Sequence, residues 1–131
     1  MKDTAKHQGL RNQLVSILEE KGIADKSVLR EIKKIPRHLF LNSSFEDYAY
    51  QDKAFPIGAG QTISQPYTVA FQSQLIEEKK EHKILEIGTA VGYSAINFVN
   101  ELEEDVYVKT IERNDKRYEE AIKNINSIGY S

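Results

Sequence analysis

The sequence predicts an α/β fold in which N-terminal helices precede a strand–helix–strand–helix unit. Residues 6–35 carry apolar residues at the three- and four-residue spacing of amphipathic helices. From residue 83 onward, short apolar runs with β-branched residues alternate with helical patterns. That alternation is typical of parallel strands joined by right-handed crossovers, the unit of Rossmann-like sheets. Because the sequence predicts only two such strands, we expect the first βαβα half of that fold, with an incomplete sheet.

Composition and charge indicate an ordinary soluble chain. The 131 residues suffice for one domain, and a net charge of −2 favours neither nucleic acid nor an anionic membrane as a partner. There is no cysteine, which excludes disulfides and thiolate metal sites. The polar N-terminus has no signal-peptide core, and no apolar run approaches the ~20 residues that span a bilayer. We therefore expect a cytoplasmic protein.

Three helices are expected in the N-terminal part. The first covers residues 6–21 and stops at Gly22, the second is capped by Asp25 or Ser27 and closed by Pro36, and the third starts at Pro66. Their inward faces are expected to hold Leu10, Leu14, Ile17 and Leu18, then Val28, Leu29, Ile32 and Ile35, then Val69, Ala70, Leu75 and Ile76. Residues 36–66 are rich in aromatics but have no sustained period, which predicts ordered, irregular backbone.

The βαβα unit follows. KILEIG (83–88) and VYVKTIE (106–112) are expected as strands, and YSAINFVNEL (93–102) as the helix between them. The last helix covers 115–129, with Asn114 or Asp115 as its cap and Gly129 at its end.

The stretch LEIGTAVGYSA (85–95) has the form of a loop that binds a nucleotide-like ligand at the carboxyl end of a strand. Gly88 allows the turn, Gly92 allows the next helix to begin close to the ligand, and the helix N-terminus favours an anionic group. Glu112 ends the next strand, where an acid can accept two hydrogen bonds from a ribose diol.

Three ligands fit this pattern, namely NAD, FAD and S-adenosyl-L-methionine. Tyr93 stands where a dinucleotide fingerprint has a small residue, which favours the ligand without a pyrophosphate. Simpler readings stay open. Glu86 can be a solvated strand-end acid, Glu112 can pair with Arg113 or Lys109, and the two glycines can serve turns alone.

The segment PIGAGQTISQPYTVA (56–70) closely resembles the signature of protein-L-isoaspartate O-methyltransferases, and IPRHLF, YQDKAFPIG and LEIG resemble the same family. This resemblance covers about residues 8–88. LEIGTAVGYSA and KTIERNDKRYEEAIKNI look more like small bacterial O-methyltransferases of the catechol and caffeoyl-CoA type, over about residues 83–131. We therefore expect either a hybrid with its seam near residues 80–88 or a divergent isoaspartate methyltransferase.

Both resemblances imply the class I methyltransferase fold with S-adenosyl-L-methionine as cofactor. They imply two parts, a helical and substrate-loop region at 1–82 and a partial cofactor-binding unit at 83–131. By resemblance, Thr62, Ile63 and Ser64 meet an isoaspartyl peptide or protein substrate, and Ser64 has the active-site role; a turn or N-cap hydroxyl before Pro66 is the plain alternative for Ser64. The positions implied for cofactor binding are Glu86, Gly88, Thr89, Ala90, Gly92, Tyr93, Ser94 and Glu112.

No metal site is expected. The histidines His7, His38 and His82 are far apart in the sequence, and Asp47 and Asp52 are expected as turn residues in an aromatic loop.

The class I fold has further strands, of which the sequence shows only the first two. We expect a truncated chain with weak or no activity, and self-association as a dimer through the open sheet edge. The alternative function is a recombined or truncated folding unit that self-associates and has no catalysis.

Overall fold

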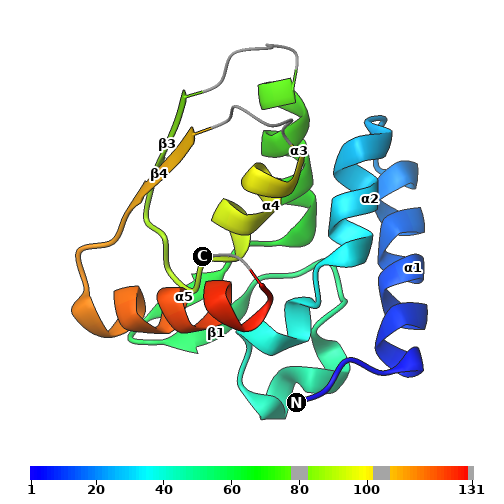
Figure 1. Cartoon of the computed structure of the whole chain (residues 1–131). Coiled ribbons are helices and arrows are strands. Elements are labelled where there is room, and N and C mark those ends of the chain that lie inside the picture. Colours follow the sequence, from blue (N-terminus) through cyan, green and yellow to red (C-terminus); the bar gives the residue numbers. More distant parts are fainter. Residues whose placement is uncertain (78–82, 102–106, 130–131) are drawn as a thin grey trace.

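The computed structural model describes residues 1–77, 83–101 and 107–129. Helices α1 and α2 form one layer, α3 and α4 lie next to them, and the two-stranded sheet β3–β4 lies on the far side (Figure 1). The elements in chain order are α1 (Ala5–Glu20), α2 (Lys26–Lys34), η1 (Arg37–Phe40), η2 (Ser43–Tyr48), β1 (Phe55–Gly58), β2 (Gln61–Ile63), α3 (Pro66–Glu77), β3 (Lys83–Ile87), α4 (Tyr93–Glu101), β4 (Tyr107–Ile111) and α5 (Asp115–Ser127).

Helices α1 and α2 begin at side-chain caps. The Thr4 hydroxyl accepts from the His7 N–H, and Asp25 accepts from the N–H groups of Ser27 and Val28. The predicted inward face of α2 is confirmed, because Val28, Leu29, Ile32 and Ile35 are all buried.

The inward face of α1 differs from the expected one. Leu14 and Leu18 are buried, but Ile17 is 38% exposed, and the polar residues His7 and Arg11 extend the buried stripe instead. Apolar spacing could not identify them, because both are buried by partners from other elements, which are described below.

Helix α3 shows a similar difference. Val69, Ala70 and Ser73 are buried, whereas Leu75 is 58% exposed. The face of α3 therefore follows positions 69, 70 and 73, and its prediction was wrong at Leu75.

The segment 36–66 is more regular than expected. It contains the two 3₁₀ turns η1 and η2 and an antiparallel hairpin, in which Phe55 pairs with Ile63 and Pro56 with Thr62. Arg37 is buried inside this segment and donates to the carbonyls of Ala49 and Lys53. A buried guanidinium therefore fixes backbone that has no repeating hydrogen-bond pattern.

The βαβα unit is confirmed. Strands β3 and β4 are parallel, in register from Lys83 opposite Tyr107 to Ile87 opposite Ile111. Val108 and Thr110 face a small apolar cavity that they share with α4 and α5. The opposite face of the sheet is open, since Leu85 is 59% and Ile87 83% exposed.

One apolar core joins the helical part to this unit. It is formed by buried residues of α1, α2 and α3 and reaches Val91, Tyr93 and Ile96 at the start of α4. In the described parts of the chain, no helix combines the length and the apolar character needed to cross a membrane.

Candidate functional site

The carboxyl ends of β3 and β4 meet at the Glu112 side chain. Its Oε2 accepts from the Ala90 N–H at 3.0 Å, and its Oε1 accepts from the Asn114 N–H at 2.9 Å and from Arg117 Nη2 at 3.1 Å. The side chain is only 5% exposed. The hydrogen bond from Asn114, followed by those from Ala90 and Arg117, holds the pKa of Glu112 below its usual value. The carboxylate therefore stays charged and links the glycine loop to the start of α5.

The loop between β3 and α4 has three residues with positive φ, namely Gly88 at +98°, Ala90 at +49° and Gly92 at +85°. The Gly88 N–H donates to the Ile111 carbonyl at 2.8 Å, so the turn begins while the chain is still paired with β4. A Cβ on Gly92 would lie 3.2 Å from Ile125 Cγ1. Gly92 is thus required where α5 packs on the loop, and its place beside a bound ligand stays a prediction.

Glu86 and Thr89 are connected through Thr110 of β4, which no local sequence pattern had indicated. Thr110 Oγ1 donates to Glu86 Oε2 at 2.6 Å and lies 2.6 Å from Thr89 Oγ1. Burial raises the pKa of Glu86, and the hydrogen bond from Thr110 acts in the opposite direction. Glu86 is therefore tied to β4 and is not a freely solvated acid.

Tyr93 is part of the core. Its side chain is 2% exposed, packs edge-on against Phe40 at 5.4 Å between ring centroids, and has the Arg37 guanidinium 4.7 Å from its ring centre. Ser94, in contrast, is partly exposed in the first turn of α4.

The hairpin that carries the TIS element presents two different surfaces. Thr62 and Ser64 are exposed, and Ile63 is buried in the core. Helix α3 begins at Pro66, so Ser64 precedes the helix by two residues and is not its N-cap.

Asp52 is the side chain that holds the start of α3. Its Oδ1 accepts from the Tyr67 N–H at 2.7 Å, its Oδ2 accepts from Gln65 Nε2 at 3.1 Å, and Lys21 Nζ lies 2.6 Å from Oδ2. Burial acts to raise the pKa of Asp52, but the hydrogen bonds from Lys21, Tyr67 and Gln65 outweigh it, so the net shift is downward. Asp52 lies in a bend, as expected of a turn residue, and in addition caps a helix that begins 14 residues further along the chain.

A cavity of about 400 Å³ lies beside the hairpin. It is bordered by the segment 39–45, by β1 and by Glu120 of α5. Strand β1 and helix α5 thus both contribute to the wall of this cavity.

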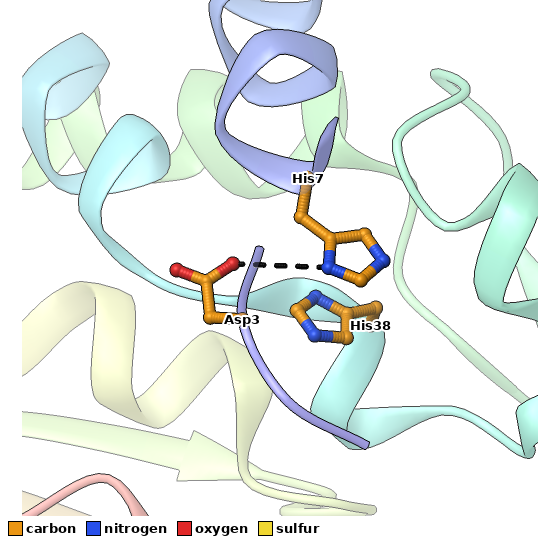
Figure 2. A group of neighbouring side chains, drawn as sticks. All are labelled: Asp3, His7 and His38. Carbon is orange, nitrogen blue, oxygen red and sulfur yellow. Dashed lines mark ion pairs between the residues drawn. The ribbon is translucent and has the colours of Figure 1, made fainter. Parts of the chain in front are cut away.

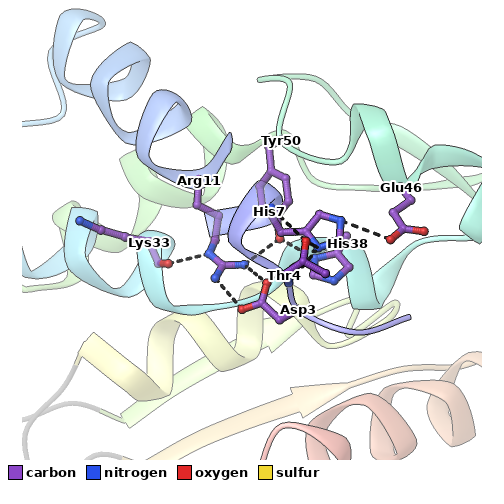
Figure 3. Close-up of polar contacts among 8 residues, drawn as sticks. All are labelled: Asp3, Thr4, His7, Arg11, Lys33, His38, Glu46 and Tyr50. Atoms are coloured by element: carbon purple, nitrogen blue, oxygen red, sulfur yellow. Dashed lines mark hydrogen bonds and ion pairs between the residues drawn. The ribbon is translucent and has the colours of Figure 1, made fainter. Parts of the chain in front are cut away.

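A second polar cluster connects the N-terminus to the irregular segment (Figure 3). Arg11 donates to both oxygens of Asp3, at 2.8 and 2.7 Å, and to the Tyr50 hydroxyl at 3.0 Å. That hydroxyl lies 2.5 Å from His38 Nδ1, and His7 Nε2 lies 3.2 Å from Glu46 Oε1. The cluster therefore joins the first residues of the chain to η1 and η2.

His7 and His38 are stacked, with ring centroids 3.8 Å apart and an angle of 19° between the planes (Figure 2). Their distance in the sequence had given no sign of this. Together with Asp3 they offer ligand atoms within 4.8 Å of one another. A metal fits poorly, however, because Arg11 occupies both Asp3 oxygens and nearly parallel rings do not direct their in-plane nitrogen lone pairs at one point. His82 lies outside the described residues.

The sequence of the chain matches the model of a known family. The match covers residues 9–131, and the family is described as protein-L-isoaspartate(D-aspartate) O-methyltransferase (PCMT). The chain belongs to this family.

Members of the family from several bacteria are close in sequence. The protein-L-isoaspartate O-methyltransferase of Flavobacterium johnsoniae is 73% identical over 119 residues, which are 90% of this chain and 54% of that relative. That of Christiangramia forsetii is 55% identical over 130 residues, 99% of this chain and 60% of the relative. The chain thus spans about half the length of the curated relatives it matches.

Solved structures agree on the fold. One protein-L-isoaspartate O-methyltransferase superposes with a TM-score of 0.80 at 28% identity, over 92% of this chain and 39% of that chain. A second, from Plasmodium falciparum and in complex with S-adenosyl-L-homocysteine, has a TM-score of 0.77 at 21% identity, over 94% of this chain and 56% of the other. The expected class I methyltransferase half-fold is confirmed.

These matches run without a break across residues 80–88, where a hybrid would have its seam. They give no support to a second half from catechol-type enzymes, and one family accounts for both parts of the chain.

Proposed function

We propose that this chain binds S-adenosyl-L-methionine at the β3–α4 loop and directs its methyl group to an isoaspartyl carboxylate of a peptide or protein. The observation that carries the proposal is the link between Glu112 at the end of β4 and Ala90 in the loop after β3. It brings a charged acceptor to the carboxyl ends of parallel strands, which is where Rossmann-like sheets bind nucleosides.

The other cofactor positions have supporting roles in this proposal. Gly88 and Thr89 form the turn, and the first turn of α4, from Tyr93 and Ser94, offers backbone N–H groups and the positive end of the helix dipole. Glu86 acts through its bond to Thr110, which orders the end of β4.

The reaction needs no strong base. An isoaspartyl carboxylate is already ionised near pH 7, so its oxygen attacks the sulfonium methyl, the new C–O bond forms as the C–S bond breaks, and S-adenosyl-L-homocysteine leaves. The protein must align the two groups and keep water away. We assign the substrate side to Thr62, Ile63 and Ser64, of which Thr62 and Ser64 are exposed to meet a peptide and Ile63 anchors the hairpin.

This proposal divides the chain by role. Residues 1–82 carry the substrate hairpin on its helical support, and residues 83–131 carry the cofactor unit. The shared core at Val91, Tyr93 and Ile96 holds the two parts together.

Calorimetry and an activity assay test the proposal on the 131-residue chain. S-adenosyl-L-methionine and S-adenosyl-L-homocysteine should give binding heat, whereas NAD should give none. The variant Glu112→Ala should bind neither S-adenosyl-L-methionine nor S-adenosyl-L-homocysteine. Transfer of a labelled methyl group to an isoaspartyl peptide tests turnover, which Ser64→Ala should reduce while cofactor binding persists. Heat from NAD, or equal binding by Glu112→Ala, would overturn the assignment.

The exposed face of the sheet favours a second behaviour, self-association as a dimer of two copies. Strands β3 and β4 have no further partner strand among the described residues. Their apolar side chains on the open face are 46 to 83% exposed, namely Leu85, Ile87, Tyr107 and Ile111. Light scattering should give twice the mass of the chain, and Ile87→Lys should shift it to the monomer. A dimer without any binding of the cofactor would favour the non-catalytic folding unit.

A further inference from the structure

The acceptor sites of Glu112 are unequally used. A carboxylate offers about four lone-pair sites, two on each oxygen. Oε1 receives two donors, the Asn114 N–H and Arg117 Nη2, whereas Oε2 receives one, the Ala90 N–H. The remaining acceptor capacity of this carboxylate therefore lies on Oε2.

Arg117 is the only one of these three donors that comes from a side chain. Its side chain is 15% exposed, and its Nε atom is buried without an acceptor among the residues that the structure describes. The guanidinium therefore depends on Glu112 for its position.

The location of Arg117 runs against local helix preferences. The Asn114 side chain caps α5 by accepting from the Arg117 N–H at 3.1 Å, so Arg117 is the third residue of the helix. A cation in the first helical turn opposes the helix dipole and is locally unfavourable there. A residue that breaks a local rule is expected where a tertiary contact or a function compensates for it. Here the compensating contact is the one with Glu112.

We propose that Arg117 is the positioning residue for cofactor binding: it pins Oε1 of Glu112 so that Oε2 receives a hydroxyl of the cofactor ribose. This inference rests on the proposed function, because it presumes that Glu112 meets a ribose. Arg117 does not touch the reacting atoms and acts through Glu112 alone.

The charge of Arg117 gives the proposal a distinct signature. An ionised carboxylate accepts on both oxygens, whereas a protonated one loses acceptor capacity. Since Arg117 is one of the groups that hold the pKa of Glu112 down, its removal should raise the pH at which binding is lost. A purely structural role would change the stability and leave this pH unchanged.

The test is calorimetry with S-adenosyl-L-homocysteine from about pH 3 to about pH 8, a range that extends below the ordinary carboxyl pKa. Arg117→Gln should weaken binding at neutral pH by about 3- to 10-fold, the order expected for one charge-assisted hydrogen bond acting indirectly. Its loss of binding on acidification should begin at higher pH than in the wild type, and Arg117→Lys should restore part of both effects. Arg113→Gln is the matched control, because Arg113 is exposed next to Glu112 and its removal changes the net charge equally.

The outcomes separate this inference from the proposed function. No heat with the wild-type chain would overturn both. Binding by the wild type, with Arg117→Gln equal to Arg113→Gln in affinity and pH dependence, would overturn the role of Arg117 alone. Tighter binding by Arg117→Gln would also overturn it, since it would mean that the guanidinium competes with the ribose for Oε1.

Discussion

At the scale of single residues, Ala90 and Gly92 show two reasons for positive φ in the same loop. Ala90 adopts φ +49° and donates its N–H to Glu112, so a tertiary hydrogen bond offsets the strain of an alanine there. Gly92 has φ +85° and also lies against Ile125, so a side chain at this position meets both strain and contact. Gly92 should therefore tolerate substitution less well than Ala90.

We predict that Gly92→Ala destabilises the fold by about 2 to 3 kcal/mol, from left-handed strain and from crowding at Ile125. Gly22→Ala is the control, because Gly22 has φ +95° but nothing within 4 Å of the added Cβ, and should lose about 1 kcal/mol from strain alone. Urea denaturation of both variants measures the difference. Equal losses would mean that the contact with Ile125 relaxes without cost.

At the scale of elements, α3 depends on a residue far from it in sequence. Asp52 caps α3 through the Tyr67 N–H and receives Lys21 from the end of α1. The same carboxylate holds Gln65, the neighbour of Ser64. It therefore fixes the junction between the β1–β2 hairpin and α3.

Replacing Asp52 should loosen this junction. We expect Asp52→Ala to cost about 1 to 2 kcal/mol, because it removes a helix cap and leaves the partly buried donors of Gln65 and Tyr67 without this acceptor. Asp47→Ala is the matched control, since Asp47 is 71% exposed in its pair with Lys6 and its removal should hardly change the stability. Thermal melting of the two variants measures the loss of stability in each. Comparable losses in Asp52→Ala and Asp47→Ala would contradict the capping role of Asp52.

At the scale of the whole molecule, the buried His38 makes stability depend on pH. Burial, and then the neighbouring His7, lower the pKa of His38 from its ordinary value of 6.5. The unfolded chain therefore takes up a proton at a pH where the folded chain does not. Stability is fully present above about pH 6.5 and is lost as the pH falls through the lowered pKa.

The groups around His38 set the size of this effect. His7 and Arg11 disfavour a positive charge on the His38 ring, whereas Asp3 favours it. The Tyr50 hydroxyl is hydrogen-bonded to His38 Nδ1. We predict that His38→Gln lowers stability near pH 7, because a buried ring is lost, but flattens the dependence on pH between about 5 and about 7. Denaturant midpoints across that range give the slope, and a slope equal to that of the wild type would assign the dependence to another group.

Local pattern was sufficient to predict the helices and strands and to indicate the family. Short-range signals include the caps at Asp25 and Asn114, the β-branched runs at 83 and 107, and the glycines at 88 and 92. The helices, the parallel strands and the turn between β3 and α4 could therefore be predicted from residues near one another. The TIS segment indicated the family for the same reason.

Contacts between distant residues decided the rest. The stacking of His7 on His38, the capping of α3 by Asp52, the burial of Tyr93 against Arg37 and the clamp of Arg117 on Glu112 join positions that no periodicity relates. The short Glu112–Arg117 spacing could have suggested a pair, but helix propensity disfavours a cation there and its partner became evident only in the folded chain. Sequence by itself thus determined which segments are helices and strands, and to which family the chain belongs. Only the tertiary structure decided which polar groups are buried together, because their burial is compensated by partners brought from elsewhere in the fold.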